Sequence, residues 1–185
     1  MSKVLVIIKS MGIGDLSILI SSIHAISKEM GGPLTVLAQK STRASAILKY
    51  DPHVEEIIEL NEKESRSFFH IIKKVKPKKF THSYIFSDSI RFYLIAKLSG
   101  IKNNFQYEFF SKKGKNFFKT AKEFTEKTLN KKINSQSKIY FDEKEMNESK
   151  KIFNISENEK NIVCGISASG PTKRWDIKNY ISLFE

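Results

Sequence analysis

The first segment with residues suited to chemistry is the loop Gly12–Ile13–Gly14–Asp15, between an apolar run and a segment of helical spacing. In open α/β sheets such loops follow the carboxyl ends of strands, where ligands bind. Glycine lets the backbone turn tightly and approach a ligand closely. We therefore interpret Gly12 and Gly14 as the support of a site whose chemical group is the carboxylate of Asp15.

Two interpretations of Asp15 remain open from the spacing alone. Aspartate is a preferred N-cap residue, and its charge at a helix start also suits the helix dipole. The carboxylate can instead act as a general base that accepts a proton from a hydroxyl. A dinucleotide-binding loop is disfavoured, because Ser17 stands where G-x-G-x-x-G needs its third glycine and the second predicted strand ends at Gln39, not at an acid.

A second loop, SASGPTKRWD at residues 167–176, combines hydroxyl groups, a glycine and two cations. Backbone N–H groups and hydroxyls in such a loop can turn toward a phosphate. Lys173 would add a point charge and Arg174 a bidentate donor, although the spacing of a P-loop is absent. The alternative is a basic loop without a ligand, in which Asp176 caps the next helix.

The segments that must position these loops alternate between short apolar runs and longer stretches of helical spacing. This alternation predicts an α/β fold, a Rossmann-like parallel sheet with helices on both faces. Strands are predicted at residues 3–8, 34–38, 54–60, 81–86 and 105–109, and helices at 16–27, 42–50, 63–75, 90–98, 111–132 and 143–153.

After a polar stretch at residues 156–161, interpreted as a linker, a new strand–loop–helix unit follows, with a strand at 161–166 and a helix at 177–184. We interpret it as the start of a truncated second α/β domain, which divides the chain into domains 1–158 and 159–185. Cys164 is the only cysteine, so no intrachain disulfide can form and a reducing compartment is expected. Its apolar surroundings predict a buried, inert thiol.

The 32 Lys and Arg residues exceed the 20 Asp and Glu residues by 12. This excess favours an anionic partner, or it only keeps the surface solvated. Lysine-rich stretches at residues 73–79 and 112–122 are candidate contact surfaces. Apolar runs of about five residues are far short of the ~20 that span a bilayer. Lys9 directly follows the short apolar run at the amino terminus, which excludes a secretory signal, so we expect a cytoplasmic protein. The four histidines lack metal-ligand spacing, so we expect no metal site.

Four segments together resemble the heptosyltransferase family of GT-B glycosyltransferases, and the likeness covers nearly the whole chain. The segment around KRW is its most specific motif. The four are KVLVIIKSMGIGD at 3–15, DPHVEEI at 51–57, SIRFYLIAKLSG at 89–100 and GISASGPTKRWDIKNYISLFE at 165–185.

The resemblance implies two Rossmann-like domains with a metal-independent active site in the cleft between them. Asp15 would be the general base on the acceptor hydroxyl. Ser169, Lys173 and Arg174 would bind the diphosphate of a nucleotide-sugar donor, ADP-heptose, with no further cofactor. The implied reaction is inverting transfer of a sugar, heptose, to a lipopolysaccharide core-type acceptor. The partners would be this anionic glycolipid and the inner face of the membrane, contacted peripherally.

Family members are nearly twice this long, so most of the nucleotide-binding domain would be missing and the chain by itself is expected to be inactive. The rival interpretation is a non-catalytic basic module that binds nucleic acid or an anionic membrane surface through its Lys- and Phe-rich stretch. Under the family resemblance, nucleic acid is the disfavoured partner. A steep dependence of binding on salt would identify such a module.

Overall fold

The computed structural model describes residues 2–9, 12–107, 116–134, 136–156, 158–166 and 174–184. The chain divides into two compact units, Met1–Asp142 and Glu143–Glu185. The domain boundary predicted between residues 158 and 159 stays a prediction.

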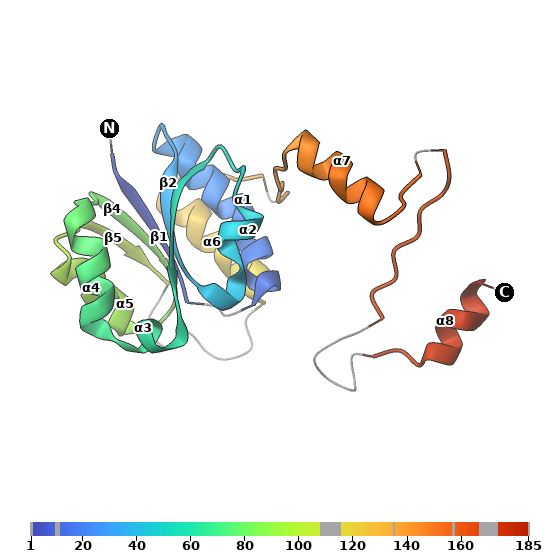
Figure 1. The fold of residues 1–185 in the computed structure, drawn as a ribbon. Coiled ribbons are helices and arrows are strands. Elements are labelled where there is room, and N and C mark those ends of the chain that lie inside the picture. The colour runs from blue at the N-terminus through green and yellow to red at the C-terminus, as the bar shows by residue number, and fades with distance from the viewer. Residues whose placement is uncertain are drawn as a thin grey trace. The chain divides into compact units, whose positions relative to one another are not determined.

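The first unit is built on a five-stranded sheet in which every neighbouring pair is parallel (Figure 1). Its strand order is β3-β2-β1-β4-β5, so β1 is central and the chain crosses from one half of the sheet to the other between β3 and β4. The predicted α/β fold is confirmed. The strands are β1 (Val4–Ile8), β2 (Leu34–Gln39), β3 (Val54–Leu60), β4 (His82–Phe86) and β5 (Asn103–Gln106).

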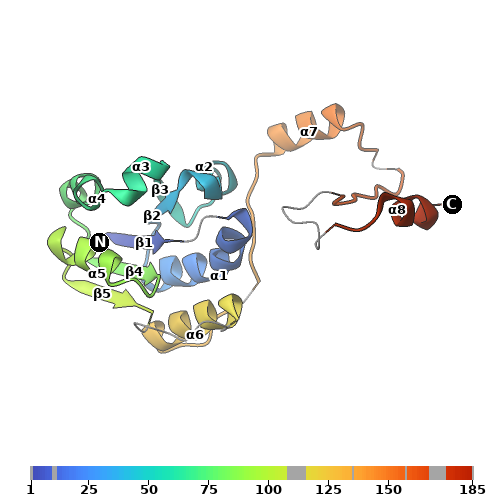
Figure 2. The ribbon, with the colours of Figure 1, turned by 90° about the horizontal axis from the view of Figure 1, so that it is seen from below.

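Helices cover both faces of this sheet because successive side chains of a strand point to opposite faces. Val4, Val6 and Ile8 of β1 pack against α1 (Ile13–Glu29) and α6 (Phe117–Leu129). The two remaining side chains of β1 belong to a second core with α4 (Phe68–Val75) and α5 (Ile90–Leu98). Figure 2 shows α1 and α6 side by side on their face of the sheet.

Two predicted helices are each divided in the structure. The helix expected at 42–50 is a 3-10 turn, η1 (Lys40–Thr42), followed by α2 (Ala44–Ile47), because Arg43 between them adopts the left-handed region with φ 53°. The helix expected at 63–75 becomes α3 (Glu62–Arg66) and α4, and a 3-10 turn, η2 (Lys76–Lys78), follows it. Ser67 separates α3 from α4: its backbone is extended, and its hydroxyl accepts from the N–H of His70.

The last strand of the sheet, β5, begins two residues before the predicted 105–109. Its first residues, Asn103 and Asn104, are polar, so hydropathy did not mark them as a strand. They form a strand because their backbone pairs with the start of β4, where the side chain of Asn104 also accepts a hydrogen bond from the hydroxyl of Ser83. Residues 108–109 of the prediction lie outside the described residues.

The second unit contains α7 (Glu143–Ile152) and α8 (Ile177–Phe184), both near their predicted positions. The predicted strand at 161–166 is wrong: these residues have no regular secondary structure, because no described strand pairs with them, and Val163 is 93% exposed. Cys164 is half-buried, not buried as expected. The segment is held to α8 by the Tyr180 hydroxyl, which donates to the carbonyl of Gly165 at 3.1 Å.

Candidate functional site

The candidate site lies where β1 and β4 end side by side. Ile8 and Phe86 are the last paired residues of the two strands, and their following helices, α1 and α5, cover opposite faces of the sheet. In open α/β folds, this switch point leaves a crevice at the carboxyl ends of the strands. Lys9 follows β1 and Asp88 follows β4, and their charged groups form an ion pair at 3.7 Å.

Asp15 is not the cap of α1. The N-cap residue is Gly12, with an extended backbone and no side-chain hydrogen bond, and Asp15 is the third residue of the helix. The capping interpretation is therefore wrong. The half-buried carboxylate still lies in the first turn, where its charge suits the helix dipole. Among the described residues, no group forms a hydrogen bond with this carboxylate that would compete with a bound hydroxyl.

The two glycines of this loop differ in their surroundings. A Cβ added at Gly12 would lie 3.5 Å from Oδ2 of Asp15, so the carboxylate folds back over the N-cap residue. A Cβ added at Gly14 would meet nothing within 4 Å. A Cβ at position 12 would thus be in ordinary van der Waals contact with the carboxylate, whereas packing among the described residues does not require glycine at position 14.

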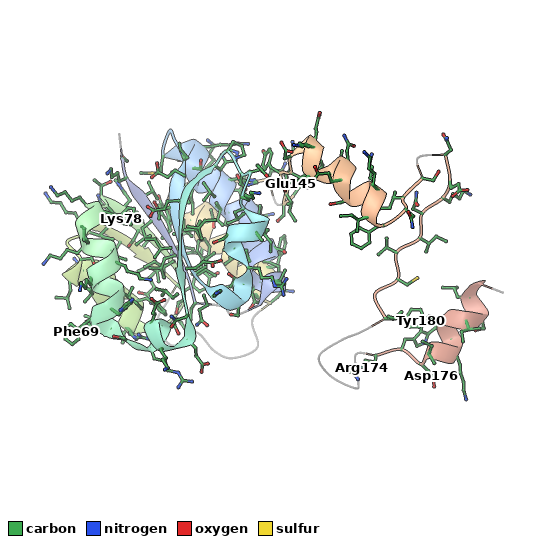
Figure 3. All side chains as sticks on the ribbon, viewed as in Figure 1. Phe69, Lys78, Glu145, Arg174, Asp176 and Tyr180 are labelled. Carbon is green, nitrogen blue, oxygen red and sulfur yellow. The ribbon has the colours of Figure 1, made fainter. Side chains whose placement is uncertain are left out.

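The second predicted loop is described only in part, because Ser169 and Lys173 lie outside the described residues. Arg174 is exposed just before α8. Asp176 precedes this helix, and its Oδ1 accepts a hydrogen bond from the N–H of Lys178 at 3.0 Å, so it is the cap that the sequence suggested. Figure 3 shows Arg174, Asp176 and Tyr180 at the start of α8.

A buried polar cluster away from this site was missed by sequence reasoning. His24 on α1 and Asp51 before β3 form a hydrogen bond of 2.7 Å, and the ring of His53 lies 4.5 Å from that of His24. His53 also hydrogen-bonds the hydroxyl of Ser27 at 3.0 Å. Burial, the His24 ring and the charge of Lys28 lower the pKa of His53, while the Asp51 carboxylate opposes them. No spacing in the sequence signals this cluster, because only folding brings α1 to the loop before β3.

The Lys- and Phe-rich stretch does not form an aromatic platform in its described part. Phe124 is 8% exposed and packs between Phe86 and Tyr107, and Phe117 also lies against this core. Phe118 is 40% exposed. Stacking of nucleic-acid bases needs several aromatic faces open to solvent. The described part of this stretch does not provide them, because the apolar side of α6 packs into the core of the protein.

Among the described residues, no three His, Cys, Asp or Glu side chains gather as a metal site would require. In the same part of the chain, every helix falls short of the length and hydrophobicity needed to cross a bilayer.

No protein-family model matches this chain, and no curated protein does. Among solved structures, a glycosyl transferase of family 9 from Veillonella parvula DSM 2008 matches with a TM-score of 0.77 and 14% identity, over 98% of this chain and 58% of that one. The ADP-heptose LPS heptosyltransferase II of E. coli matches with a TM-score of 0.66 and 17% identity, over 98% and 60%. The chain thus spans less than two thirds of either, and the expected glycosyltransferase-type fold is confirmed.

Proposed function

We propose that this chain is the acceptor-side part of a glycosyltransferase that moves a sugar, heptose, from a nucleotide-diphosphate donor to a lipopolysaccharide core-type acceptor. One observation carries the proposal. The half-buried carboxylate of Asp15 lies in the first turn of α1, at the carboxyl edge of a sheet whose fold recurs in two glycosyltransferase structures.

In the proposed reaction, Asp15 accepts the proton of the acceptor hydroxyl while that oxygen bonds to the anomeric carbon of the donor sugar. The bond from this carbon to the diphosphate breaks in the same displacement, and the nucleoside diphosphate leaves with the electron pair. A single displacement inverts the configuration at the anomeric carbon. General-base assistance of this kind contributes about 10²- to 10⁴-fold in rate.

The donor in this proposal is ADP-heptose, with its diphosphate held by Ser169, Lys173 and Arg174. Cationic side chains and hydroxyls can offset the charge that grows on the leaving diphosphate without a metal. Arg174 is exposed directly before α8, a placement that is compatible with this role.

The proposed acceptor is an anionic glycolipid, and contact with the inner face of the membrane would bring the enzyme to it. Exposed apolar side chains on α5 recur every fourth residue at Ile90, Leu94 and Leu98, and Phe69 on the adjacent α4 is 80% exposed (Figure 3). Exposed lysines lie in the last turn of α4, at residue 73, and just after its end, at residues 76 and 79. Apolar side chains beside basic ones suit the surface of an anionic bilayer.

The proposal is tested with the full-length product of the reading frame that encodes this chain. Incubated with ADP-heptose and a heptose-free core glycolipid, it should produce a glycolipid heavier by one heptose, detected by mass spectrometry. ADP-glucose serves as the matched donor control. Failure to transfer sugar from any nucleotide-diphosphate donor would refute the proposal, whereas transfer from another donor would correct only the heptose assignment.

A further inference from the structure

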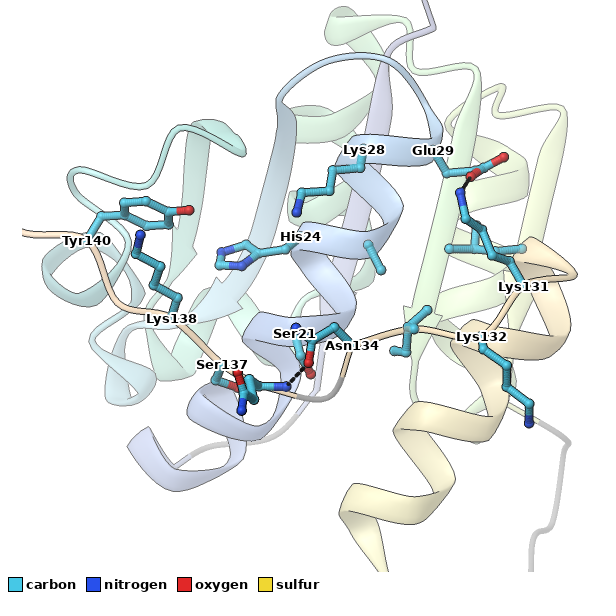
Figure 4. A pocket seen from close by; sticks show the side chains of 14 residues that line it. Ser21, His24, Lys28, Glu29, Lys131, Lys132, Asn134, Ser137, Lys138 and Tyr140 are labelled. Atoms are coloured by element: carbon cyan, nitrogen blue, oxygen red, sulfur yellow. Dashed lines mark hydrogen bonds and ion pairs between the residues drawn. The ribbon is translucent and has the colours of Figure 1, made fainter.

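A groove of about 500 Å³ runs along the outer surface of α1, on the side opposite the sheet (Figure 4). Its other wall is the end of α6 and the described residues of the segment 131–140 that follows. The hydroxyl of Ser137 donates to the carbonyl of Ser17 at 2.7 Å and so fastens this segment to α1. All of the groove therefore belongs to the first unit of the chain.

The charged side chains that line the groove are four lysines and one glutamate, a formal excess of 4 − 1 = +3. Two of the lysines are neutralised: Lys131 pairs with Glu29 at 2.9 Å and Lys132 with Glu126 at 3.3 Å. Lys28 and Lys138 have no carboxylate partner in the part of the chain that the structure describes. The uncompensated charge of the groove is thus concentrated on these two ammonium groups.

Lys28 and Lys138 lie at the same end of the groove, together with His24 and Tyr140 (Figure 4). The ammonium of Lys138 is 4.7 Å from the centre of the Tyr140 ring, which in turn lies 5.8 Å from the ring of His24. His24 is fixed from behind by Asp51. These contacts fix the position of the aromatic rings next to the two cations. Both lysine side chains are themselves exposed to solvent.

We propose that this end of the groove binds a phosphate-bearing ligand between Lys28 and Lys138, with the Tyr140 hydroxyl as a further donor. A phosphate group carries up to two negative charges and several acceptor oxygens, which match two compact cations and a hydroxyl. The site is distinct from that of Asp15, because Lys28 lies about 20 Å further along α1 at 1.5 Å per residue. It does not depend on the proposed sugar transfer.

The test is calorimetric titration of the 185-residue chain with inorganic pyrophosphate at low salt. The wild type should bind with a saturable isotherm, and the double variant Lys28→Ala, Lys138→Ala should bind at least about tenfold more weakly. The control is Lys3→Ala, Lys102→Ala, which removes the same charge from exposed positions before β1 and β5 and should retain the affinity within about threefold. Thermal melting of all three proteins verifies that they are folded.

No saturable binding to the wild type, or an equal loss in both double variants, would overturn the site. A second arm separates the two sources of such a group. Sedimentation with vesicles of phosphatidylglycerol, against phosphatidylcholine, identifies a lipid headgroup if binding falls in the Lys28, Lys138 variant. Unchanged vesicle binding alongside lost pyrophosphate binding identifies a soluble phosphate compound.

Discussion

Gly12 lies directly beneath the carboxylate of Asp15, with 3.5 Å between Oδ2 and the place that a Cβ on Gly12 would occupy. The backbone of Gly12, with φ −107° and ψ 152°, is open to any residue, so its conformation does not demand glycine. A serine or aspartate here would cap α1 better than glycine does. Glycine at the N-cap position therefore spares the carboxylate this contact, at some cost in helix stability.

Gly12→Ser should raise the free energy of unfolding and lower the turnover of the proposed sugar transfer. Its hydroxyl can cap the first turn, and the unfolded chain loses freedom, a gain of about 0.5–1 kcal/mol. The same hydroxyl can donate to Asp15 and so compete with the acceptor hydroxyl for the carboxylate, which should lower turnover by about tenfold. Urea unfolding and turnover measure the two effects. Gly12→Ala lacks the hydroxyl and should lose less turnover, and an equal loss would contradict the account.

Asp51→Ala should destabilise the first unit by about 2–4 kcal/mol, because His24 and the N–H of His53 would both lose a buried acceptor. Urea denaturation measures this. The matched control is Glu62→Ala, which breaks the exposed pair with Arg66 and should cost less than about 0.5 kcal/mol. Similar losses in the two variants would show that the buried cluster has no special structural role.

His53 should make the protein less stable in acid. Its pKa is lowered on folding from 6.5, so the unfolded chain binds more protons as the pH falls through that value, and protonation favours unfolding. Urea unfolding at about pH 8 and about pH 5.5 gives the loss. His53→Phe keeps a ring but removes the titration, so its loss should be smaller. A loss as large as that of the wild type would assign the effect to other groups.

Phe124→Ala should cost about 3–5 kcal/mol, because this ring fills the core between α6 and the sheet. Phe118 is on the same helix but 40% exposed, and Phe118→Ala should cost less than about 1 kcal/mol. Thermal or urea unfolding of the pair tests whether α6 is a core element. If both variants were equally stable, the Lys- and Phe-rich stretch would again be available as a binding surface.

Hydropathy predicted the sheet well where strands are buried on both faces, as with β1, since every side chain of such a strand is apolar. It failed for β5, whose first residues are asparagines, and for residues 161–166, which are mostly apolar yet have no described strand beside them. An apolar sequence favours a β-strand, but the strand forms only where another strand lies beside it to accept and donate its backbone hydrogen bonds.

The sequence could predict the individual loops of the candidate site, but not the contacts between residues from different segments. The glycines and Asp15 mark the end of β1, but the position of the helix start depends on the local backbone, so the sequence could not decide between capping and catalysis for Asp15 or identify Gly12 as the cap. The pair of Lys9 with Asp88 requires β4 to lie next to β1, a matter of strand order. The contact between His24 and Asp51 also depends on tertiary packing, because it joins residues far apart in the sequence that no motif spacing connects.

The role of Asp15 as a base is tested most directly by the turnover of Asp15→Asn in the full-length product of the reading frame, at saturating donor and acceptor. The amide keeps the size of the side chain but cannot take the proton, so kcat should fall by about 10²- to 10⁴-fold while donor affinity is retained. A kcat equal to that of the wild type would contradict the account and remove Asp15 from the mechanism.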